Sequence, residues 1–171
     1  MTVLAFETET PGANPLDMFE QDIFEADWPV IRTADDELVI TIKGNWCDYQ
    51  ISITWREDMS ILHYACTFDA GLSKRDLPAQ KETEMYTLNG MINEHLMFGH
   101  FDMWKHESAI VFRHSQLLHG SSTSAEQCEC IVQIAVDACE KFYPAYQFVL
   151  WAGKPAKEAL AASVFETKGQ A

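Results

Sequence analysis

The strongest constraint on the fold is a series of four alternating segments with almost no chain between them. In the clearest one, Tyr49, Ile51 and Ile53 alternate with polar side chains, which is the period of a strand with one buried face. Turn residues such as Asp35-Asp36 separate the segments. Connections this short join antiparallel neighbours, because a parallel pair needs a long crossover. The predicted strands are Val30–Ala34, Leu38–Lys43, Asp48–Arg56 and Ile61–Asp69.

Helical patterns flank these strands. Asn14-Pro15 is typical of an N-cap followed by proline at the first helical position, and this helix should end near Asp27. A loop over 70–80 is followed by a predicted helix from about Lys81 to Phe98, which Gly99 closes, and by a predicted hairpin of Phe101–His106 and Ala109–Leu118. The next predicted helix begins at the capping box of Ser124 and Gln127 and continues to about Tyr143, where Pro144 kinks or interrupts it. A last helix is predicted over Pro155–Phe165. The order α-β-β-β-β-α-β-β-α-α predicts an α+β fold with an antiparallel sheet flanked by helices.

The length of 171 residues is that of one ordinary domain. We expect a flexible N-terminal segment over 1–13 and a single domain over 14–166. The chain has neither a signal-peptide pattern at its start nor a run of about 18 apolar residues. Its five cysteines form no disulfide framework and are expected to be reduced. These features predict a soluble cytoplasmic protein.

The charge is negative and unevenly distributed. The net charge is −14, and residues 1–58 hold 13 acidic and three basic side chains, which gives 3 − 13 = −10. A field of this sign repels phosphate backbones and anionic lipids. We therefore expect neither nucleic acid nor membrane as a partner. The acidic surface serves simple solubility or, alternatively, a basic partner.

The histidines do not form a metal-binding pattern. The chain has six of them, and the densest group is His95, His100 and His106. Spacings of five and six residues do not place a ligand pair on one helical face, and HExxH is absent. We expect no metal and no cofactor. The remaining histidines are His63, His114 and His119.

The other candidates for chemistry are equally weak. Cys128 and Cys130 point about 200° apart on a helix, so they cannot hold one ion together. Cys128 and Cys139 lie on an apolar stripe, whereas Cys130 lies on the polar face and is an incidental thiol or a redox-sensitive one. The segment 119–122 (His-Gly-Ser-Ser) lacks the GxSxG setting. Glycine-rich phosphate loops are absent, and we predict no enzymatic activity.

The second hairpin carries the candidate binding residues. A two-residue turn at Glu107-Ser108 would pair Asp102 with Arg113 and Trp104 with Val111, and these four side chains would share one face. The predicted pairs are His106–Ala109, Trp104–Val111 and Asp102–Arg113. Such an ion pair is usually structural. Tryptophan beside arginine is also typical of an interface, so these four residues are the predicted partner-binding site.

A second aromatic segment follows along the chain. Five aromatic side chains fall within ten residues: Phe142, Tyr143, Tyr146, Phe148 and Trp151. Packing against the sheet is the default for such a segment. A partly exposed ledge that is open to a partner is the alternative.

Several short motifs in a fixed order resemble the bacterial YbjN-domain family, described as regulators of sensory transduction. The motifs are Asn14-Pro15-Leu16, Glu25-Ala26-Asp27-Trp28, Trp46-Cys47-Asp48-Tyr49, Trp55-Arg56-Glu57, Ile92-Asn93-Glu94-His95, Gly99-His100-Phe101-Asp102, Phe112-Arg113-His114 and the run 142–151. The resemblance covers about residues 14–162. It implies a fold like that of type III secretion chaperones, which usually dimerise and bind extended segments of client proteins.

The sequence is therefore compatible with two functions. The first is a non-catalytic protein-binding module, a chaperone- or adaptor-like regulator that acts on a protein partner as a homodimer. The second is a small-molecule- or metal-responsive sensor or enzyme that uses the surface histidines. A ligand that binds the native state raises the melting temperature, so a ligand panel separates the two.

Overall fold

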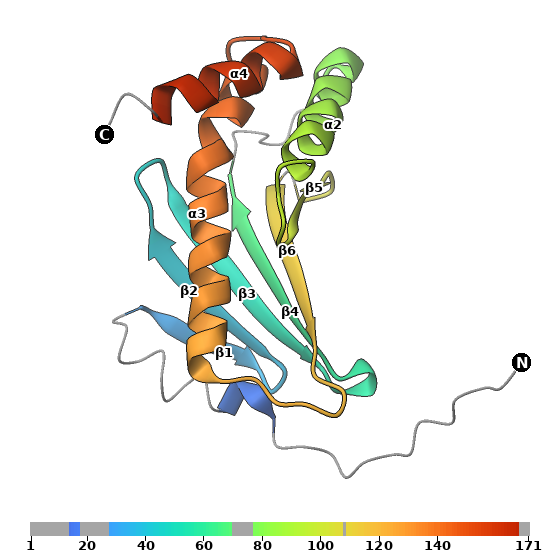
Figure 1. Cartoon of the computed structure of the whole chain (residues 1–171), viewed down its shortest axis with the longest axis vertical. Coiled ribbons are helices and arrows are strands. Elements are labelled where there is room, and N and C mark those ends of the chain that lie inside the picture. The colour runs from blue at the N-terminus through green and yellow to red at the C-terminus, as the bar shows by residue number, and fades with distance from the viewer. Residues whose placement is uncertain (1–13, 18–27, 70–76, 108, 168–171) are drawn as a thin grey trace, which may run out of the picture.

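The computed structural model describes residues 14–17, 28–69, 77–107 and 109–167, with the backbone alone for 164–167. Its centre is a six-stranded antiparallel sheet in the order β1-β2-β3-β4-β6-β5 (Figure 1). The strands are β1 (Val30–Ala34), β2 (Glu37–Lys43), β3 (Asp48–Arg56), β4 (Ile61–Phe68), β5 (His100–Trp104) and β6 (Ala109–Leu117). The predicted α+β fold and all six predicted strands are confirmed, with ends that differ by at most two residues.

Helix α3 (Ala125–Leu150) lies across one face of this sheet, as Figure 1 shows. Alternate side chains of the strands point toward it, and burying them removes a continuous apolar surface from water. An aromatic cluster joins the two layers: the ring of Tyr146 on α3 lies 5.7 Å from Phe68 and 5.7 Å from Phe101. The inner-face residues with no exposed surface include Leu38, Ile40, Tyr49, Ile51, Ile53, Leu62, Cys66, Ile110 and Phe112.

Helices α2 (Ala79–Asn93) and α4 (Ala156–Thr167) lie at the end of the sheet where α3 finishes (Figure 1). Two charged side chains of α2 join it to its neighbours, one to the end of α3 and the other to the start of α4. Lys81 Nζ donates to the carbonyl of Leu150 at 2.7 Å, and the carboxylate of Glu84 accepts from the amide of Ala156 at 2.7 Å. Each charge has the sign that the dipole of the adjoining helix end favours. The corner between α3 and α4 is thereby fixed.

The predicted C-terminal bound of α2 is wrong. The helix begins at Ala79, two residues before the predicted Lys81, but it ends at Asn93 rather than Phe98. The early end has a local cause, because the Asn93 amide pairs with the backbone of Phe101: its nitrogen donates to the carbonyl at 3.1 Å and its oxygen accepts from the N–H at 2.7 Å. Gly99, at φ +66°, turns the chain into β5, and a Cβ there would overlap the Phe112 ring.

The predicted interruption of the third helix at Pro144 is also wrong. Helix α3 continues through Pro144 to Leu150. Proline costs about 3 kcal/mol inside a helix, but Ala145, Tyr146 and Val149 beyond it are buried in the core. Their packing offsets the lost hydrogen bond. The predicted N-terminal capping box of Ser124 and Gln127 is confirmed, with the Ser124 hydroxyl accepting from the Gln127 amide at 3.2 Å.

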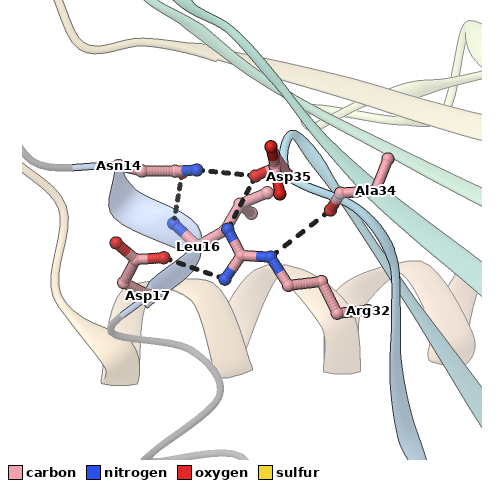
Figure 2. A network of polar contacts seen from close by, with 6 residues as sticks. All are labelled: Asn14, Leu16, Asp17, Arg32, Ala34 and Asp35. Atoms are coloured by element: carbon pink, nitrogen blue, oxygen red, sulfur yellow. Dashed lines mark hydrogen bonds and ion pairs between the residues drawn. The ribbon is translucent and has the colours of Figure 1, made fainter.

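At the start of the described chain, Pro15–Asp17 form a helical turn that Asn14 caps, since its Oδ1 accepts from the Leu16 amide at 3.0 Å. Arg32 on β1 joins this turn to the β1–β2 connection: it donates to Asp17 at 2.8 Å and to the Asp35 carbonyl at 2.6 Å (Figure 2). The remainder of the predicted first helix, to residue 27, lies outside the described residues, as does 1–13. None of the described helices has the length and apolar character needed to span a membrane.

Candidate functional site

The face of the sheet that points away from α3 is the outer face. Within the part of the chain that the structure describes, no helix lies over it (Figure 1). One row of paired residues crosses all six strands on this face: Ile31, Val39, Ser52, Ala65, Arg113 and His100. The residues of this row on β1, β2 and β3 are aliphatic or carry a hydroxyl group. The side on β6 and β5 carries the aromatic and charged residues predicted as a binding site.

The four predicted site residues do share the outer face, but their predicted register is wrong. The turn between β5 and β6 contains residues 105–108 rather than two residues, so the pairing is shifted by two. Because a shift of two preserves the alternation of a strand, the same side chains remain on the same face. The observed pairs are Trp104–Ala109, Asp102–Val111 and His100–Arg113, in place of Trp104–Val111, Asp102–Arg113 and His106–Ala109.

Arg113 is the centre of the arrangement. Its Nη1 donates to Asp102 Oδ2 at 3.2 Å across the diagonal, and its guanidinium lies 5.9 Å from the centre of the Trp104 ring. Its Nε is buried without a hydrogen-bond partner. Below these side chains Val111 and Ala65 are buried, with 0% and 1% exposure. A partly exposed tryptophan and a partly exposed ion pair thus cover small apolar residues.

The Asp102 carboxylate has both of its oxygens engaged. Oδ2 accepts from Arg113, and Oδ1 accepts from the Met103 amide at 2.8 Å. The ion pair retains 35% exposure at the arginine and 41% at the aspartate, so solvent screening limits its contribution to stability to below about 1 kcal/mol.

The structure brings together histidines other than the predicted group. His63 on β4 lies opposite Ser115 on β6, with Nδ1 2.9 Å from the Ser115 Oγ, and His100 lies opposite Arg113. His63 was missed as a site residue, although alternation along β4 already places it on the same face as Ala65 and Thr67. Neither the exposed His95 nor the exposed His106 joins a metal site: among the described residues, no group of three or more His, Cys, Asp or Glu could hold a metal ion.

Burial and neighbouring charge act on two of the histidines. The pKa of His63 is lowered, first by burial and then by the proximity of Arg113 and His100. The pKa of His114 is lowered mainly by burial, and its ring stacks on Phe98 with centroids 3.6 Å apart. At neutral pH both imidazoles are therefore uncharged, and protonation of either costs more than in water.

Three of the five thiols have raised pKa values, which favour their neutral form. Cys139 is fully buried and its Sγ lies 3.6 Å from that of Cys66. Burial is the main cause of the raised pKa of Cys139, of Cys128 and of Cys47, which reaches about 11. Thiols with raised pKa values are poor nucleophiles. Cys128 and Cys139 are core residues and Cys130 is exposed, as predicted, and all five cysteines are free.

The aromatic run 142–151 is mostly core, as expected by default. Phe142 and Tyr146 are buried, at 2% and 0% exposure. Tyr143 is partly buried and stacks under Trp46, with ring centroids 6.0 Å apart. Only the end of the run forms a ledge, because Trp151 retains 71% exposure at the C-terminus of α3.

Acidic residues from two separate turns meet at one end of the sheet. The Trp55 amide donates to the Asp36 carbonyl at 2.8 Å, which joins the β1–β2 turn to the end of β3, just before the 3₁₀ turn η2 (Glu57–Met59). The Asn14 side chain donates to the Asp35 carbonyl at 2.7 Å and closes this end (Figure 2). The resulting open cleft of about 420 Å³ is lined by Asn14, Asp35, Asp36, Trp55, Arg56, Glu57 and Asp58.

An α+β domain with an antiparallel sheet, one face under a long helix, is the class that fold and site define. A family model with the description "Putative bacterial sensory transduction regulator" matches residues 15–148. That range contains every strand and most of α3, and the chain belongs to this YbjN family. The description names a regulator and no enzymatic activity. Neither the curated proteins nor the solved structures gave a match.

Proposed function

We propose that this protein is a non-catalytic protein-binding module, a chaperone- or adaptor-like regulator that works as a homodimer. It binds a protein partner through the outer face of its sheet. The observation that carries the proposal is the arrangement of Trp104 and Arg113 above the buried Val111. Tryptophan and arginine dominate the binding energy of protein interfaces when they lie over a well-packed base. The regulator description of the family supports the same role.

The chemistry of the outer face supports binding over catalysis. His63 and Ser115 do form a histidine–serine pair at 2.9 Å. A catalytic pair of this kind needs a third group that orients the base. The neighbouring carboxylate, Asp102, has both oxygens engaged by Arg113 and by the Met103 amide. The cleft at the acidic end of the sheet is lined by other residues.

The shape of the face indicates the form of the bound segment. A sheet surface is pleated and twisted, and its side chains stand roughly perpendicular to it. An extended segment of a partner can lie across the strands with its side chains between those of Trp104, Arg113 and Thr67. The likeness to secretion chaperones seen in the sequence motifs supports this mode, since such chaperones bind extended clients.

The test is partner capture by three single variants of the full chain. We expect Trp104→Ala and Arg113→Ala to reduce capture by at least about tenfold, the loss typical of an interface anchor. Tyr86→Ala is the matched control, because it removes an exposed aromatic ring on α2, outside the sheet. The partner is identified by mass spectrometry after affinity purification, and dissociation constants are then measured with the purified partner.

Normal capture by both Trp104→Ala and Arg113→Ala would refute the outer face as the binding surface, provided that their melting temperatures match that of the wild type. The dimer is tested separately by analytical ultracentrifugation. We expect about twice the chain mass of 19.4 kDa. A monomer at micromolar concentration would remove the homodimer from the proposal without affecting the partner-binding face.

A further inference from the structure

Three groups that carry or can acquire positive charge lie on neighbouring strands of the outer face. Arg113 on β6 is directly opposite His100 on β5. His63 on β4 is directly opposite Ser115, the next outer-face residue along β6. Directly opposed side chains are about 5 Å apart at Cβ and diagonal ones about 7–8 Å. The three therefore form one cluster, here called the basic cluster, in a chain whose net charge is −14.

Each member has hydrogen-bonding capacity directed to solvent. Arg113 uses Nη1 for Asp102, and about a third of its side chain, 35%, stays exposed. His63 has Nδ1 against the Ser115 hydroxyl, and His100 is exposed. The neighbouring Asp102 does not turn the cluster into a cation site, because both of its oxygens already accept hydrogen bonds. The unsatisfied donors of the cluster fit an acceptor that carries negative charge.

We propose that the basic cluster of His63, Arg113 and His100 binds a carboxylate side chain of an extended acidic segment of the partner protein, and binds it more tightly in mild acid. This inference rests on the proposed function, since it supplies the chemistry of the partner. Arg113 is charged at every physiological pH, and its pairing with Asp102 uses only Nη1, so its other guanidinium nitrogens provide the constant part of the binding as charge-assisted donors. The His63 imidazole provides the part that protons control.

The charges around His63 set the direction of this control. Burial, and then Arg113 and His100 on the outer face, keep the pKa of His63 low, so the free protein holds this ring uncharged at neutral pH. A carboxylate bound beside it favours the charged ring. Binding and proton uptake are therefore linked, and each strengthens the other.

The other charged groups facing the cluster do not cancel this effect. Arg56 on β3 lies diagonal to His63 and pairs with Asp58 at 3.5 Å. Glu37 on β2 is separated from His63 by Thr54. On the opposite side of the sheet, His114 adds repulsion if it is protonated. Of the acids named here, Asp102 lies closest to the cluster, and Arg113 neutralises it.

The experiment uses a synthetic hexaglutamate peptide as the probe and follows the amide resonances of the full chain by NMR at pH 6.0 and pH 7.5. Glutamate remains ionised at both values. We expect binding about fivefold tighter at pH 6.0, with shifts concentrated on β4, β6 and β5. A hexaglutamine peptide should not bind. These magnitudes correspond to two partly exposed charge interactions.

Matched variants separate the cluster from the other imidazoles. His63→Gln/His100→Gln should retain weak binding with no pH dependence, whereas His95→Gln/His106→Gln removes two imidazoles elsewhere and should behave as wild type. Arg113→Gln should abolish binding at both pH values, and Arg113→Lys should restore part of it. Absence of hexaglutamate binding at pH 6.0, or a pH dependence that persists without His63 and His100, would overturn the inference.

The outcomes also separate the inference from the proposed function. If Trp104→Ala abolishes partner capture while hexaglutamate fails to bind, the outer face is the docking surface and the acidic segment is wrong. If hexaglutamate binds the cluster while partner capture is independent of Trp104, the carboxylate site stands and the proposed docking function is overturned.

Discussion

The two faces of the sheet are built from alternate residues of the same strands, yet they have opposite physical characters. On β6, Phe112 points inward and is fully buried beneath α3, whereas Arg113 points outward and is partly exposed. The inner face is held by apolar burial, which scales with area and does not depend on pH. The outer face is held by a few hydrogen bonds and charges that solvent screens. Stability therefore resides mainly on one face and recognition, as we propose, on the other.

The sharpest way to break this comparison is to truncate one residue on each face. Phe112→Ala should lower the free energy of unfolding by about 3–5 kcal/mol, because it removes a ring with no exposed surface and leaves a cavity. Ser115→Ala, three residues along the same strand and exposed, should change it by less than about 0.5 kcal/mol. Urea denaturation measures both. Equal losses would mean that the outer face contributes to stability as the core does.

A second variant pair sharpens the account of how β5 is positioned over the core. Gly99→Ala should cost about 2–3 kcal/mol, because it combines a positive φ of 66° with overlap of the Phe112 ring. Gly120→Ala is the matched control: its φ is 68°, but open space surrounds the added methyl group. It should cost about 1 kcal/mol. Thermal melts of both variants separate backbone strain from steric overlap, and equal costs would exclude the ring contact.

The smallest expected effect is the pH dependence that the outer face adds to stability. The pKa of His63 is lower in the folded chain than its ordinary value of 6.5. Its contribution to stability is therefore fully present above pH 6.5 and is lost as the pH falls toward the folded pKa. His63→Gln should flatten the fall in melting temperature between pH 7 and pH 5. A residual slope is expected from His114, whose pKa is lowered as well.

Measurements of wild type and His63→Gln at pH 8 provide the control for this series. Both chains carry an uncharged group at position 63 there, so their difference reports only the loss of the Ser115 hydrogen bond. If the two melting curves stayed parallel from pH 8 to pH 5, His63 would not be coupled to folding, and the electrostatic description of the outer face would need revision.

The strands and their faces were predictable because a period of two is a local signal. Tyr49, Ile51 and Ile53 reveal the buried face of β3 without any knowledge of its neighbours. The same alternation placed Asp102, Trp104, Val111 and Arg113 on one face even though the turn length was misjudged. Alternation determines on which face of the sheet each side chain lies. It does not determine which residues pair across the two strands, because that register depends on how many residues the turn contains.

What could not be predicted depends on contacts between residues that are distant in sequence. The early end of α2 results from the pairing of Asn93 with Phe101, and the continuity of α3 through Pro144 results from packing on both sides of it. His63 and Ser115 are brought together by the pairing of β4 with β6, which are separated in the sequence by α2 and β5. The sequence carries no local signal for that pairing. The histidine cluster predicted from sequence spacing therefore differs from the one in space.

The pairing of Asn93 with Phe101 has a further consequence for assembly. At the β5 border of the sheet, an amide side chain already takes the donor and acceptor of Phe101, and the Met103 N–H is taken by Asp102. A strand of another protein could pair with this border only by displacing the hydrogen bonds that these backbone groups already make. Natural proteins protect exposed sheet borders against runaway polymerisation by such means. The β5 border is thus protected against strand addition at Phe101 and Met103, and the docking that we propose takes place on the outer face, apart from this border.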